Sequence, residues 1–184
     1  MSIRAVMVAL AVATASSAGA ALPGLYAGAC YAAAEHGWPV RESLMVCTLA
    51  LRDRGLSLRD RGATLVNRGI VQYRARQTAA AIADYDKALE VAPGLAEARV
   101  NKAIALVGAG RDREAIDLLS AAIADGPAEP EVAYYTRAMA NEDLGALRAA
   151  YDDYTRAAAL APGWSEPAEQ LRRFTVVRRP TALG

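Results

Sequence analysis

The sequence predicts an all-α fold of stacked helical hairpins, because it is rich in alanine, poor in aromatic residues and internally repeated. Hydrophobic residues make up 54% of the 184 residues but aromatic residues only 6%, and alanine alone fills 44 positions. Alanine has the highest helix propensity, and its small side chain lets helices approach closely. A β-sandwich would need more β-branched and aromatic residues, so the composition argues against that fold class.

Three segments of the chain align with one another at a period of 34 or 35 residues. Each unit closes on a proline, at Pro93, Pro127 and Pro162. Alanine recurs in register with these prolines, at Ala81, Ala115 and Ala150 and again at Ala88, Ala122 and Ala157. Small residues suit the places where antiparallel helices cross, and proline ends a helix because it lacks the backbone N–H. Each hairpin would bury its apolar face against the next one.

This pattern resembles the tetratricopeptide repeat family, whose unit is a 34-residue helix–turn–helix. The family's small position 8 and its position 24 are occupied here by Gly69, Ala103 and Ala138 and by Tyr85, Leu119 and Tyr154. The turn glycine of the family matches Gly110 and Gly145, while the first unit has Gln77 there. The family's tryptophan at position 4 is missing, and Arg99, at that position in the second unit, predicts a local irregularity. The resemblance implies a right-handed α-solenoid.

The alignment divides the chain into seven parts. We expect a signal peptide at 1–20, a degenerate helical hairpin at 21–61, repeats at 62–95, 96–129 and 130–163, a capping helix at 164–177 and a tail at 178–184. Arginines make the tail and the end of the capping helix basic; we expect a solvated tail, and contact with an anionic surface is the alternative.

The first 20 residues have the three-part pattern of a secretory signal peptide. Arg4 is the only charge before Glu35, an apolar run spans 5–13, and Ala18 and Ala20 fit a cleavage site after position 20. The apolar run is shorter than the 20 or so residues of a membrane span. We therefore expect an exported, periplasmic protein without a membrane span after cleavage. An uncleaved N-terminal anchor and a lipid on Cys30 are the alternatives.

The two cysteines, Cys30 and Cys47, fall in the N-terminal hairpin. The sequence predicts one helix at 26–35, a turn at 36–39 and a second helix at 40–54. Numbered on the repeat, the cysteines take positions 7 and 24, which face each other across an antiparallel hairpin. An exported chain with two cysteines is expected to form a disulfide between them. Free buried thiols are the alternative.

The first helices of the repeats are the expected binding surface, because in the resembled family they line a concave groove for peptides or partner helices. Asn67, Asn101 and Thr136 share position 6, where an amide offers both a donor and an acceptor to a peptide backbone. They would form a ladder along the groove; the alternative is a structural bridge between repeats. The other candidate groove residues are Ile70, Tyr73, Arg74, Glu97, Ile104, Tyr135 and Met139.

Position 7 carries a base and position 23 an acid in the first and third repeats. Because these positions face each other in the hairpin, we expect ion pairs between Arg68 and Asp84 and between Arg137 and Asp153. A partly buried pair of this kind fixes geometry more than it adds stability.

Several functional classes are disfavoured by the inventory of side chains. There is one histidine, and GxSxG, HExxH and P-loop motifs are missing, so we expect neither an enzyme nor a metal or other cofactor. The net charge of +1 argues against a nucleic-acid binder. The sequence predicts a non-catalytic adaptor or scaffold of the bacterial envelope with a protein or peptide partner. A structural subunit of a homo-oligomer is the alternative.

Overall fold

The computed structural model describes residues 24–175, and in this range all regular secondary structure is helical. The helices are α1 (Leu25–His36), α2 (Val40–Arg52), α3 (Leu58–Arg74), α4 (Thr78–Val91), α5 (Ala96–Val107), α6 (Asp112–Asp125), α7 (Pro130–Asp143), α8 (Leu147–Leu160) and α9 (Ser165–Leu171). This confirms the predicted fold class. The predicted leader at 1–20 and tail at 178–184 lie outside the described residues.

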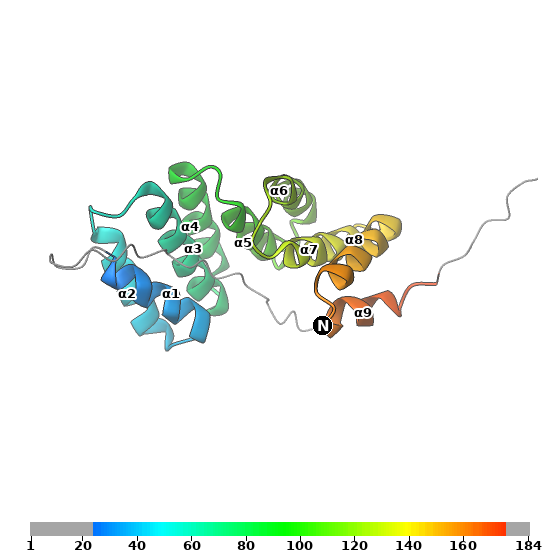
Figure 1. Ribbon diagram of the computed structural model, residues 1–184, viewed down its shortest axis with the longest axis horizontal. Coiled ribbons are helices and arrows are strands. Elements are labelled where there is room, and N and C mark those ends of the chain that lie inside the picture. Colours follow the sequence, from blue (N-terminus) through cyan, green and yellow to red (C-terminus); the bar gives the residue numbers. More distant parts are fainter. Residues whose placement is uncertain (1–23, 176–184) are drawn as a thin grey trace, which may run out of the picture.

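Consecutive helices pair into antiparallel hairpins that stack along one long axis (Figure 1). The pairs are α1–α2, α3–α4, α5–α6 and α7–α8, and the second helix of each pair also packs against the first helix of the next. The first helices α1, α3, α5 and α7 touch in that order along the stack. The architecture is therefore an α-solenoid in which each unit contacts mainly its neighbours.

Position 69 requires a glycine because the Tyr85 ring lies against it where α3 and α4 cross. A Cβ atom on Gly69 would come within 2.4 Å of Tyr85 Cε1, and the Tyr85 side chain is fully buried. The third repeat makes the same crossing with Ala138 and Tyr154 in one apolar cluster. The small position 8 thus sets how closely the two helices of a hairpin approach.

We expect Gly69→Ala to lower the free energy of unfolding by about 1–2 kcal/mol, since overpacking a core costs more than the better helix propensity returns. Urea denaturation measures the change. Gly28→Ala in α1 is the matched control, because a Cβ there meets nothing within 4 Å. The control is expected to be neutral or stabilising by up to about 1 kcal/mol. Equal effects at both glycines would contradict the close contact with Tyr85.

The turn inside the first repeat differs from the sequence interpretation by one residue. Arg76, and not Gln77, takes the left-handed conformation, with φ 62°, that Gly110 (φ 72°) and Gly145 (φ 75°) take in the other repeats. The backbone of a residue that has a Cβ atom is strained in this left-handed conformation, whereas that of glycine is not. The first repeat therefore keeps the turn at a cost in backbone strain.

Replacing Arg76 by glycine is expected to raise the free energy of unfolding by about 1 kcal/mol, because it removes that strain. The reciprocal change, Gly110→Arg, should lower it by a similar amount, and open space around Gly110 excludes a steric cause. Thermal denaturation of both variants checks the pair. A loss of stability in Arg76→Gly would show that the arginine side chain contributes more than its backbone costs.

Arg99 does not disturb the fold, contrary to the sequence interpretation. Helix α5 is continuous through it. The Arg99 guanidinium donates to the Pro93 carbonyl oxygen and pairs with the Asp125 carboxylate. The arginine thus ties the turn before α5 to the end of α6, in place of the apolar packing that a tryptophan would give.

The N-terminal hairpin is closed by a disulfide between Cys30 and Cys47, the pairing predicted from the repeat alignment. Both cysteines are fully buried, and Cys30 Sγ lies 3.8 Å from the carbonyl oxygen of Thr64 in α3. Leu44 and Leu51 of α2 pack on the apolar cluster of the first repeat. The hairpin therefore stacks on α3 as a further unit of the solenoid.

The capping helix is shorter than the predicted 164–177, since α9 ends at Leu171. The chain then turns, and Phe174 folds back against Tyr151 and Tyr154 with ring centroids 5.8 and 6.0 Å away. These ring contacts take the chain out of the helical path. Position 177 lies beyond the described range.

Candidate functional site

The predicted position-6 ladder is inside the protein, which is a correction to the groove proposed from the sequence. Asn67 and Asn101 are 0% exposed and Thr136 is 6% exposed. Asn101 Nδ2 donates to the Glu97 carbonyl oxygen at 2.9 Å, and Thr136 Oγ1 donates to Val132 at 2.8 Å, both within their own helices. Neighbouring first helices pack too closely to leave these side chains at the surface. Position 6 is therefore buried inside the array, and these hydrogen bonds of Asn101 and Thr136 lie within single helices rather than between repeats.

The aliphatic candidates are buried as well. Ile70 is 0% and Ile104 5% exposed, and each belongs to the apolar cluster of its repeat. They hold the hairpins together and offer little surface to a partner. The first-helix candidates that a partner can reach are Tyr73, Arg74, Glu97, Tyr135 and Met139.

Tyr73 and Arg74 lie at the end of α3, beside the turn of the first repeat. The Tyr73 hydroxyl lies against Gly108, the residue that follows α5, where a Cβ would meet Tyr73 Oη at 2.4 Å. Burial raises the pKa of Tyr73, and the nearby Arg76 charge opposes this shift. The Arg74 guanidinium donates to the carbonyl oxygen of Ala34 in α1. The basic end of the expected groove is thus fastened to the N-terminal hairpin.

Glu97 and Tyr135 take part in the joints between helices. Glu97 Oε1 accepts a hydrogen bond from the Ala128 N–H at 3.3 Å, across the turn that precedes α7. Tyr135 packs between Trp164 and Tyr154, with centroid distances of 4.7 and 5.4 Å and the ring planes inclined to each other. Burial raises the pKa of the Tyr135 hydroxyl. Both side chains hold neighbouring elements together, and part of each remains accessible to solvent.

The acidic end of the face is formed by the end of α7. Glu142 is half-buried and accepts from Tyr154 Oη at 3.0 Å, and Asp143 is exposed. Burial raises the pKa of Asp112 at the start of α6, and the Asp143 charge raises it further.

The two predicted ion pairs are present, and each is bidentate. Arg68 Nε and Nη2 lie 2.6 and 2.7 Å from the Asp84 carboxylate, and Arg137 Nε and Nη2 both lie 2.8 Å from Asp153. The acids are 3% and 6% exposed. These pairs join the two helices of a hairpin, which makes their role structural.

The second repeat replaces this pair with a bridge between repeats. Its position 23 is Leu118, and Lys102 Nζ instead lies 2.5 Å from Asp86 Oδ1 of α4 in the preceding repeat. The position-7 cation therefore pairs with an acid in all three repeats: within the hairpin in the first and third repeats, and across to the preceding repeat in the second.

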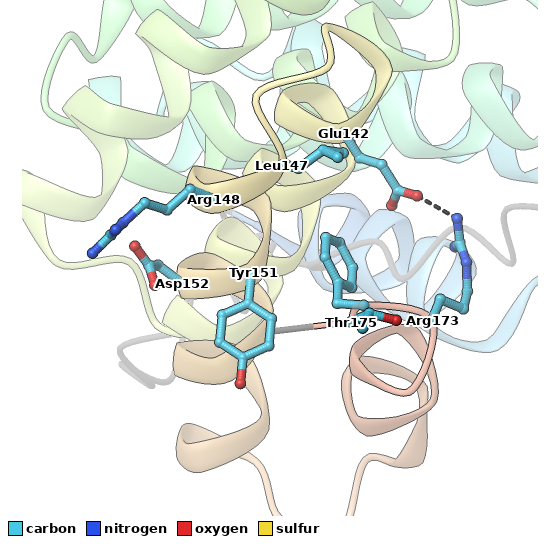
Figure 2. A pocket seen from close by; sticks show the side chains of 8 residues that line it. Glu142, Leu147, Arg148, Tyr151, Asp152, Arg173 and Thr175 are labelled. Carbon is cyan, nitrogen blue, oxygen red and sulfur yellow. Dashed lines mark hydrogen bonds and ion pairs between the residues drawn. The ribbon is translucent and has the colours of Figure 1, made fainter. Parts of the chain in front are cut away.

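A pocket that the sequence analysis missed lies near the C-terminal end of the stack (Figure 2). Its volume is about 580 Å³. It is lined by Glu142, Leu147, Arg148, Tyr151, Asp152, Arg173, Phe174 and Thr175. Glu142 and Arg173 form an ion pair on one wall, and Leu147 is 56% exposed. The available signal was apolar Leu144 and Leu147 on either side of the Gly145 turn.

Within residues 24–175, no group of three or more histidine, cysteine or acidic side chains is arranged to hold a metal ion. Among the helices described, none has both the length and the apolar character of a membrane span.

Comparison with known proteins agrees with the repeat architecture. No curated protein sequence matches the chain. The fold resembles MamA residues 41-end from Desulfovibrio magneticus RS-1, with a TM-score of 0.67 and 21% identity, over 81% of this chain and 81% of that chain. It also resembles another MamA crystal structure, with a TM-score of 0.65 and 19% identity, over 81% and 78% of the two chains. Residues 72–141 match the tetratricopeptide repeat family.

Proposed function

We propose that this protein is a non-catalytic adaptor or scaffold that binds a protein or peptide partner. The observation that carries the proposal is the row of first helices α3, α5 and α7, which touch one another in sequence along the stack. Proteins of the tetratricopeptide repeat family bind partners through this face. The chain's similarity to MamA supports the fold and leaves the partner to experiment.

The binding surface we propose is smaller than the one expected from the sequence. It consists of the accessible side chains of Tyr73, Arg74, Glu97, Met139 and Asp143, without the buried asparagines. Tyr73 and Arg74 are neighbours at the end of α3, and Met139 and Asp143 lie in the second half of α7, so one apolar side chain accompanies the basic end and another the acidic end. An extended or helical segment with one or two apolar anchors and an opposite charge at each end suits this surface.

Matched charge reversals test this surface. Asp143 lies on the proposed face, and Asp117 lies on α6; both are exposed and take part in no ion pair within residues 24–175. Asp143→Lys should weaken capture of the partner from envelope fractions about fivefold, the scale of 1 kcal/mol, whereas Asp117→Lys should leave it unchanged. Equal capture by wild type and both variants would count against the first-helix face.

We also propose that the protein is exported to the periplasm. The pattern of residues 1–20 supports this, and a disulfide is the form that two cysteines take in an oxidising compartment. The intact mass of the protein from the envelope fraction should correspond to cleavage after Ala20 and to one disulfide without a lipid. An uncleaved chain, or one carrying a lipid on Cys30, would support one of the anchored alternatives.

A further inference from the structure

Both ends of the solenoid expose apolar side chains. At the N-terminal end Leu25 of α1 is 62% exposed and Met45 of α2 is 56% exposed. At the opposite end Leu147 is 56% and Leu144 is 43% exposed. Figure 1 shows α1 and α2 at one end of the long axis and α9 at the other. Solenoids normally cover their ends with polar caps, so both surfaces have the character of an internal joint.

The joint at the C-terminal end is only half filled. Within the array, the second helices α2, α4 and α6 each pack against a following first helix of 12–17 residues, whereas α8 packs against α9, which has 7. The pocket lies on the first half of α8, where Leu147 and Tyr151 form one wall (Figure 2). The vacant space is therefore part of the place that the next repeat would take.

The free surface of the N-terminal hairpin has the shape of an incoming repeat. Cys30 and Ala34 are on the side of α1 that packs on α3. Leu25, Ala29 and Ala32, at spacing i, i+4 and i+7, form a stripe on the other side of the helix, and none of them is buried. Two alanines in this stripe would allow another helix to approach closely.

The charges at the two ends also fit one orientation. First and second helices alternate in direction, so all second helices begin at the same edge of the solenoid. A hairpin stacked in the direction of the array would bring the start of its α2, with exposed Glu42, to the edge where α8 begins with exposed Arg148. Neither residue has an ion-pair partner within the part of the chain that the structure describes.

We propose that a second copy of this chain stacks its α1–α2 hairpin on the α8 end, so that copies associate head to tail. The contact continues the joint between repeats, and it pairs Glu42 of one copy with Arg148 of the next. Such a contact is heterologous and leaves one free end of each kind, so it builds short linear chains of copies. It uses the ends of the stack and does not depend on the proposed partner face.

Complementary end variants of the full-length protein test this assembly. Leu147→Glu blocks one end, Ala32→Glu blocks the other, and Leu58→Glu changes an equally exposed leucine, 66% exposed, at the start of α3. Analytical ultracentrifugation across a micromolar concentration series should show growing mass for wild type and the Leu58 variant. Each end variant alone should be a monomer. An equimolar mixture of the two end variants should form dimers and nothing larger, because one intact end of each kind remains.

The pattern of masses decides between head-to-tail stacking and the other occupants of these surfaces. A monomeric wild type at every concentration would overturn the proposal, and it is the result expected if the chain itself or another protein fills the pocket. A mixture that stays monomeric, or an end variant that still dimerises, would overturn it as well. If Ala32→Glu reduces the helical circular dichroism signal, Leu25→Glu takes its place as the N-terminal end variant.

A charge swap tests the pairing of the two ends. Glu42→Arg should reduce association, and adding Arg148→Glu to the same chain should restore it.

Discussion

Replacing Asp84 by alanine is expected to lower the free energy of unfolding by about 3 kcal/mol. The change removes the bidentate partner of Arg68 and leaves a guanidinium whose side chain is 19% exposed between two helices. Removing one member of a buried pair costs about 3–5 kcal/mol, and the residual hydration of Arg68 places the effect at the lower end. Thermal unfolding should show a fall in Tm of about 6–12 °C for a chain of this size.

Two further variants separate the cost of an unpaired charge from the contribution of the pair. The double variant Arg68→Met with Asp84→Leu should recover most of the lost stability, because well-packed apolar groups replace a buried pair at little cost. Glu114→Ala removes a partner of Arg111 in a pair whose side chains are 48% and 57% exposed, and it should leave Tm unchanged. A double variant as unstable as Asp84→Ala would contradict this account.

Removing the disulfide is expected to destabilise the N-terminal hairpin by about 3 kcal/mol, the chain-entropy value for a loop of this length. The bond joins residues that are 17 apart in the sequence, and it holds α1 and α2 together as they pack on α3. Because the units of a solenoid unfold with partial independence, the loss should be local. In the double variant Cys30→Ala with Cys47→Ala, hydrogen exchange should accelerate in α1 and α2.

Helices α5 to α8 are the internal control in this experiment, and their exchange should match that of the wild type. Wild type treated with a reductant should approach the exchange of the double variant, slowly because both sulfurs are fully buried. Unchanged exchange in α1 and α2 would show that packing on α3 alone holds the hairpin. Uniform acceleration along the chain would show that the hairpin is needed for the whole stack.

The helical hairpins and their internal ion pairs followed from the sequence because they depend on local spacing. The small residue at Gly69 and the ring of Tyr85 are 16 positions apart, and so are Arg68 and Asp84. In an antiparallel hairpin, partners whose midpoint falls at the turn face each other, and the midpoints of both pairs fall at the turn between α3 and α4. The same reasoning predicted the cysteine pair, which needs only the register of one hairpin.

The accessible surface could not be predicted in the same way, because it depends on how closely neighbouring units stack. Asn67 and Asn101 occupy the position expected for a ladder, yet adjacent first helices cover both side chains completely. The bridge from Lys102 to Asp86 likewise crosses between repeats. No spacing within one unit reveals these contacts, since they are set by the rotation and distance between units.

The pocket and the exact position of the strained turn could not be predicted from the sequence, and each has a different physical cause. The pocket exists because α9 ends at Leu171 and Phe174 turns back on Tyr151, and aromatic contacts of this kind override the helical pattern. The left-handed turn residue was misplaced by one position, since the first repeat has no glycine to mark it and Arg76 takes the conformation. Where a repeat lacks its marker residue, alignment fixes the turn only to within a residue.

Photo-crosslinking in the native envelope tests the central claim, that the first-helix face binds a partner. A photoreactive amino acid would replace Tyr73 or Met139 on this face, and Lys87 or Ala121 on the second helices as matched controls. We expect one shared adduct from positions 73 and 139 and none from positions 87 and 121. Adducts from the second-helix positions alone, or the same adducts from all four positions, would contradict this claim.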